Sequence, residues 1–192
     1  MAAAMDNLYR VPERTSFMIK SSYYYNIKED ADKSLAVVKM WSQIYPNDIE
    51  AYNLMGLYYT IRQDLPNAII AYERILEIDP SQVKLIRTIA SLHRQQGNTD
   101  EAETFFIRFV EMFPTNTEGY RDLAGLYSSA GQLEKAREIL EKAQLVDPGD
   151  LDITLGLIGI DIKYGKFEHA ARALDSELGK GSTFTIRLPL KQ

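Results

Sequence analysis

The sequence predicts an all-α fold: a superhelix of about five antiparallel helix pairs, followed by a short extended tail. Prolines recur at a constant spacing of 34 residues, at Pro46, Pro80, Pro114 and Pro148. The segments between them carry small and large apolar residues at the same relative places. Because a proline just past a helix ends it, evenly spaced prolines indicate one structural unit repeated along the chain.

The repeated units are expected at residues 15–48, 49–82, 83–116, 117–150 and 151–176, between a lead-in at 1–14 and a tail at 177–192. In the second unit, small residues stand at Gly56 and Ala68, with larger apolar residues around them. Small residues let two helices approach closely, and the large neighbours fill the remaining space. Gly97, Gly131 and Gly165 stand where a turn must join the two helices of a pair.

This pattern resembles the tetratricopeptide-repeat family. In residues 49–82 the resemblance is carried by Tyr52, Met55, Gly56, Tyr59, Ala68, Tyr72 and Pro80. The units at 83–116 and 117–150 have similar residues at the same places. The resemblance implies a right-handed superhelix in which the first helix of each pair lines a concave inner surface. It also implies a non-catalytic protein whose ligand is a segment of another protein.

The two end units depart from the pattern, as expected for repeats with only one neighbour. In the first unit, Ser22 and Ser34 are expected at the small positions, and Trp41 stands where a small residue is usual. In the last unit, Ile158 replaces a small residue and Asp161 replaces an aromatic one. Two interpretations of Asp161 stay open: a shifted local register that exposes it, or a functional buried acid.

Composition excludes several classes of protein. The net charge of −5 and the pI near 5.2 argue against a nucleic-acid partner, which needs a basic surface. The absence of cysteine excludes disulfides and thiolate metal sites. The sequence shows neither a signal peptide nor an apolar run of the roughly 20 residues that span a bilayer. A cytoplasmic protein without a membrane partner is expected, either monomeric or weakly self-associating.

No group of residues suggests catalysis, a cofactor or a metal. The histidines are His93 and His169. His93 stands where other units have a tyrosine, which predicts a packed core position, and His169 is expected at the surface. Nothing in the sequence assembles a nucleophile, a base and an oxyanion site. We therefore expect a protein that is not an enzyme.

The last residues, GKGSTFTIRLPLKQ, change from a helical to an alternating pattern. They resemble the end of the ATP-binding domain of sensor histidine kinases, and the entry into the first unit resembles segments appended to bacterial Ser/Thr kinases. The other motifs that hold the nucleotide cannot be placed in this chain, so Gly179 and Gly181 are not assigned to an ATP site. An alternative function is therefore a regulatory fragment of a bacterial signalling kinase.

A candidate peptide-binding groove follows from helical periodicity. At 100° per residue, the residues opposite the buried arc of each first helix face the groove. The groove residues are Asn53, Leu57, Ile61, Lys84, Arg87, Ser91, Arg94 and Arg121. The third unit has no acidic residue at any of its groove positions. The favoured function is thus an adaptor that binds an acidic or mixed acidic–apolar peptide, although cations are also common on ordinary helix surfaces.

Overall fold

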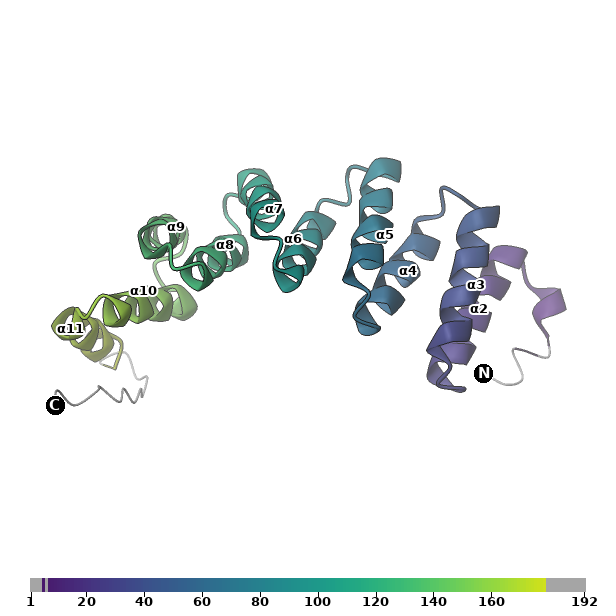
Figure 1. Ribbon diagram of the computed structural model, residues 1–192, viewed down its shortest axis with the longest axis horizontal. Helices are drawn as coiled ribbons and strands as arrows, with labels where there is room; N and C mark the ends of the chain where they lie inside the picture. The colour runs from purple at the N-terminus through teal and green to yellow at the C-terminus, as the bar shows by residue number, and fades with distance from the viewer. Residues whose placement is uncertain (1–4, 6, 179–192) are drawn as a thin grey trace. The chain divides into compact units, whose positions relative to one another are not determined.

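The computed structural model describes residue 5 and residues 7–178, and within them it is all-α with no strand, as predicted (Figure 1). A 3₁₀ helix, η1 (Leu8–Arg10), precedes ten α-helices. These are α2 (Glu13–Asn26), α3 (Ala31–Ile44), α4 (Ile49–Ile61), α5 (Leu65–Ile78), α6 (Lys84–Gln96), α7 (Thr99–Met112), α8 (Thr117–Ser129), α9 (Leu133–Val146), α10 (Leu151–Lys163) and α11 (Phe167–Leu178). The strand-like tail predicted at residues 177–192 falls almost wholly outside the described residues.

The helices divide between two compact units. The first unit ends at Phe105 and contains α2 to α6, and the second begins at Phe106 and contains α8 to α11, with α7 crossing the division. Within each unit, consecutive helices pack as antiparallel neighbours (Figure 1). Each proline of the 34-residue pattern lies just after a second helix, at the place where the sequence predicts a stop.

The turn inside each helix pair uses a left-handed residue. Gly97, Gly131 and Gly165 have φ angles of 82°, 74° and 71°, as their predicted turn role requires. The equivalent residues of the first two pairs are Glu29 (φ 52°) and Gln63 (φ 61°). All five pairs therefore close with the same backbone geometry, but two of them do so with a side chain that disfavours it.

Small residues set the distance between paired helices. A Cβ atom added to Gly56 in α4 would lie 2.5 Å from the ring of Tyr72 in α5. Gly156 of α10 has the same role between neighbouring pairs, because a Cβ atom there would lie 2.8 Å from a methyl carbon of Leu140 in α9. Ala136 is completely buried. The predicted pattern of small residues beside large ones is thus the actual packing rule of the pairs.

The first pair corrects one residue of the sequence analysis. Ser21, not Ser22, is the fully buried small residue of α2, and its carbonyl accepts a 2.9 Å hydrogen bond from the hydroxyl of Ser34 in α3. Helix α2 begins at Glu13, two residues before the expected start of the unit. Trp41 is buried as well, and its ring stacks on Phe17 with a centroid distance of 6.2 Å.

Asp161 supplies the second correction. A shifted register was one expectation, which would have exposed this side chain, but the residue is only 2% exposed. It remains in register because α10 continues without a break to Lys163, and two partners compensate its charge. Those partners are Arg137 of α9 and His169 of α11.

Candidate peptide-binding surface

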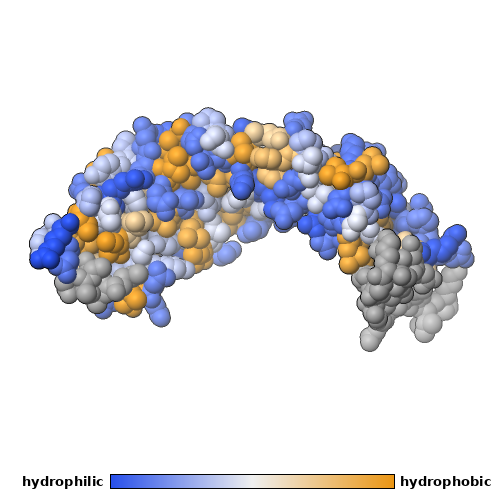
Figure 2. Space-filling view, turned by 180° about the vertical axis from the view of Figure 1, so that it is seen from behind, coloured by the Kyte–Doolittle hydropathy of each residue, from blue (hydrophilic) through white to orange (hydrophobic). Residues whose placement is uncertain are grey.

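The predicted groove residues of α4 lie on a solvent-facing stripe. Asn53, Leu57 and Ile61 are all exposed, with Leu57 at 44% and Ile61 at 46%. The stripe exists because the opposite side of α4, which includes Ala51 and Gly56, is buried against its neighbours. Figure 2 shows exposed hydrophobic residues lying among polar ones over the N-terminal unit. Helix α4 thus offers an apolar contact surface at its C-terminal end.

The predicted groove residues of α6 form a basic stripe. Lys84 and Arg94 are exposed, and Arg87 and Ser91 are half-buried. The other side of this helix contributes Ile86, Ile89 and Ala90 to the core. Asp and Glu do not occur anywhere between Lys84 and Gln96. Helix α6 thus presents three cations and has no acidic residue of its own, in a chain that is acidic overall.

Helix α5 packs against both α4 and α6, so these two stripes belong to the first compact unit. Arg121 belongs to the second unit. Its guanidinium forms ion pairs with Asp152 and, at 3.6 Å, with Asp150. The structure therefore brings seven of the eight predicted groove residues into one unit and shows that the eighth is already occupied by carboxylates.

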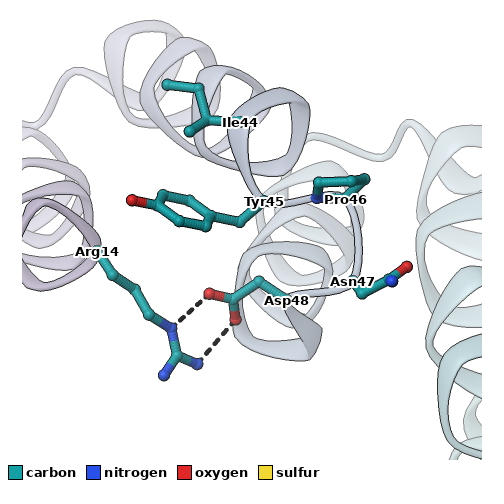
Figure 3. Close-up of a pocket in the computed structure, with 6 residues that line it drawn as sticks. All are labelled: Arg14, Ile44, Tyr45, Pro46, Asn47 and Asp48. Carbon is teal, nitrogen blue, oxygen red and sulfur yellow. Dashed lines mark hydrogen bonds and ion pairs between the residues drawn. The ribbon is translucent and has the colours of Figure 1, made fainter.

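A shallow cavity of about 420 Å³ lies beside the turn between α3 and α4, and Figure 3 shows the ion pair at its edge. Arg14 Nη2 donates a 2.9 Å hydrogen bond to Asp48 Oδ1, and Trp41 Nε1 donates one of 2.9 Å to Asp48 Oδ2. The backbone N–H of Glu50 also donates to Asp48, which caps α4.

This network explains the chemistry of Asp48. Burial raises the pKa of this carboxyl, but the hydrogen bonds from Arg14 and Trp41 outweigh burial, so the pKa lies below its usual range. Asp48 thus stays ionised and engaged in holding α2, α3 and α4 together, a structural role rather than a binding one. Sequence reasoning missed it, although Arg14 and Asp48 are separated by one repeat length.

Asp161 has a similar environment in the last helix pair. Burial raises its pKa, and hydrogen bonds from His169 and Arg137 lower it more strongly, so the net shift is downward. The carboxylate is therefore an ion-paired anchor between α9, α10 and α11. His169 is exposed, as expected, whereas His93 is half-buried and stacks on Phe105 with a centroid distance of 5.5 Å. Within the described part of the chain, no three His, Asp or Glu side chains gather at a potential metal site.

Comparison with known proteins defines the class of this chain. Family models described as tetratricopeptide repeat match residues 49–82 and residues 87–151, which together are just over half of the chain. The chain belongs to the tetratricopeptide-repeat family. The sequence matches no curated protein. Among the described helices, none is long and apolar enough to cross a membrane.

Several solved structures share the fold. A structure of MamA residues 41-end from Desulfovibrio magneticus RS-1 is 19% identical, covering 91% of this chain and 99% of that one, with a TM-score of 0.71. A tetratricopeptide-repeat protein from Parabacteroides merdae is 18% identical, covering 87% of this chain and 66% of that one, with a TM-score of 0.72. YrrB, described as a TPR protein with an unusual peptide-binding site, is 17% identical, covering 85% and 84%, with a TM-score of 0.63. At these identities the likeness shows the fold alone.

Proposed function

We propose that this chain is a non-catalytic adaptor that binds an acidic or mixed acidic–apolar segment of a partner protein along α4 and α6. The observation that carries the proposal is the composition of α6, which has three cations and not one carboxylate in an acidic chain. The exposed Leu57 and Ile61 of α4 add an apolar surface in the same compact unit. Charge from α6 and apolar contact from α4 together define the ligand.

The expected affinity is modest. A hydrogen bond to a charged group contributes on the order of 1.5–3 kcal/mol when well formed, and less when water screens it. Two or three such bonds from Lys84, Arg87 and Arg94, with contact to the apolar stripe, correspond to micromolar binding, about −8 kcal/mol. YrrB, a structural neighbour, is likewise described as having a peptide-binding site.

A charge-reversal experiment tests the proposal. The probe is a fluorescein-labelled peptide in which Leu residues alternate with Asp and Glu, measured by fluorescence anisotropy. The double variant Lys84→Glu, Arg94→Glu should weaken binding by about tenfold or more. The double variant Arg108→Glu, Lys142→Glu is the matched control, because it changes the net charge equally on exposed residues of second helices. Equal loss in both variants would show only a general charge effect and would refute the site.

The alternative, a regulatory fragment of a bacterial signalling kinase, depends on the sequence of the tail. That segment lies outside the described residues. ATP binding by the intact chain, lost when the chain is cut after Leu178, would favour this alternative over the adaptor.

A further inference from the structure

The second unit has a small recess on the side where α8 and α10 meet. It has a volume of about 190 Å³ and is lined by Arg121, Ala124, Gly125, Ser128, Leu140, Asp152, Gly156 and Ile160. The residues from α8 fall three or four apart and those from α10 four apart, so each helix turns one face to the recess. Leu140 of α9 also lines the recess.

The floor of the recess is apolar. Ala124, Leu140 and Ile160 are all buried, each at 5% exposure or less. Two positions in the walls, Gly125 and Gly156, have no side chain to fill the space. Gly156 is explained by packing, since a Cβ there would meet Leu140, but Gly125 is exposed. The volume is below the roughly 300–1,000 Å³ of small-molecule pockets, which suits a single side chain.

Charges lie only at the two ends of the recess. At one end, Arg121 is neutralised by Asp150 and Asp152. At the other end, the ammonium group of Lys163 donates a 2.8 Å hydrogen bond to the hydroxyl of Ser128, a neutral partner. Among the described residues, no carboxylate lies within ion-pair distance of Lys163. The positive charge of Lys163 is therefore not neutralised by any carboxylate of the described residues.

We propose that this recess is a second ligand subsite, which takes one apolar side chain of an extended partner segment while a neighbouring carboxylate of that segment pairs with Lys163. The buried floor selects an apolar group, the volume limits it to about the size of Leu, and Lys163 selects an acidic neighbour. The subsite lies in the second unit and does not depend on the α4–α6 surface.

The experiment distinguishes the recess from the α4–α6 surface by comparing the affinities of two peptides that differ in one apolar side chain. Fluorescein-labelled peptides Ser-Asp-Glu-X-Glu-Asp-Ser, with X as Leu or Ala, are titrated with the full chain. The Leu peptide should bind about tenfold more tightly than the Ala peptide, because the larger side chain fills the recess. Because Leu57 and Ile61 of α4 also contact leucine in the proposed function, the effect of filling the recess is measured in the Lys84→Glu, Arg94→Glu background. There, Gly125→Leu, which fills the recess from an exposed helical position, should abolish this ratio, and Lys163→Glu should weaken both peptides.

Gly159→Leu is the matched control. Gly159 is also a glycine inside a helix, but it does not line the recess, and nothing lies within 4 Å of a Cβ placed there. This variant should keep the Leu-to-Ala ratio. The variant Lys84→Glu, Arg94→Glu should weaken both peptides and also keep the ratio. The affinity of this variant therefore tests the α4–α6 surface, and the ratio tests the recess, so that either proposal can be refuted without the other. Circular dichroism checks that each variant is folded.

Three results would overturn the subsite. One is a Leu-to-Ala ratio near one in the intact chain, and the second is an unchanged ratio in Gly125→Leu. The third is a dimer, seen in sedimentation, that Gly125→Leu dissolves, because the occupant would then be a second copy of this chain. Absence of binding by either peptide up to about 1 mM would refute both the subsite and the α4–α6 surface.

Discussion

At the scale of single residues, the turns of the first two helix pairs hold unfavourable backbone geometry. Glu29 and Gln63 adopt left-handed φ angles that glycine adopts in the other three pairs. Replacing Gln63 with Gly should stabilise the chain by about 0.5–1 kcal/mol, since the steric cost of the left-handed geometry exceeds the added chain entropy. Gly131→Gln should destabilise by a similar amount. Urea unfolding midpoints measure both, and a Gln63→Gly variant less stable than the parent would contradict this explanation of the turn.

The buried carboxylates predict sensitivity to acid. Asp48 and Asp161 have folded-state pKa values below the unfolded value of about 3.9. A lowered folded pKa means that the stabilisation is present above about pH 4 and is lost as the pH falls through the folded pKa. The free energy of unfolding should therefore drop between about pH 5 and pH 2.

Asp161→Asn should reduce that pH dependence and cost about 2 kcal/mol at neutral pH, because the amide keeps an acceptor but leaves Arg137 with only the exposed Glu141, at 3.9 Å, as an anionic partner. The control is Asp147→Asn, on an exposed residue of the same unit. The explanation fails if both variants keep the full acid sensitivity of the parent chain.

At the scale of helices, two glycines in comparable places make opposite predictions. Gly56→Ala should destabilise by about 1–3 kcal/mol, because the new methyl group would collide with the ring of Tyr72. Gly159→Ala should stabilise by up to about 1 kcal/mol, because that site is open and alanine favours a helix. Chemical denaturation of the two variants tests whether packing, rather than helix propensity, decides where glycine occurs.

Ala136→Leu tests the same rule at a second-helix position. Ala136 is fully buried, so the larger side chain should overpack α9 against its partner and cost about 1–3 kcal/mol. Ala171→Leu, at an exposed position of α11, is the control and should be close to neutral. Full tolerance of Ala136→Leu would contradict the packing rule of the pairs.

The period of 34 residues was sufficient to predict the helix pairs, their stops and their glycine turns, because proline and glycine act locally. Features that depend on side-chain contacts between helices were not predictable in the same way. The sequence predicted Arg121 as a groove cation, but in the structure Asp150 and Asp152, at the N-terminus of α10, form ion pairs with it. Asp161 is buried because Arg137 and His169, from two other helices, compensate its charge. In α2 the buried small residue is Ser21, one position before the predicted Ser22.

At the scale of the whole molecule, the sign of the salt effect distinguishes a local basic surface from overall charge. The chain carries a net charge of −5, so the average field repels an acidic peptide, and added salt would screen that repulsion and strengthen binding. Contact with Lys84, Arg87 and Arg94 predicts the reverse. Affinity for the acidic–apolar peptide should fall several-fold between about 50 mM and about 300 mM salt. A rise over this range would contradict recognition by α6.

The most direct test of the central claim is a residue-by-residue map of where the acidic–apolar peptide binds. Amide resonances of the isotope-labelled chain are followed by two-dimensional NMR as the peptide is added. Binding along α4 and α6 predicts the largest shifts at Asn53, Leu57, Ile61, Arg87 and Ser91, with little change on α3 or α5. Shifts confined to α3 and α5, with α6 unaffected, would contradict the account.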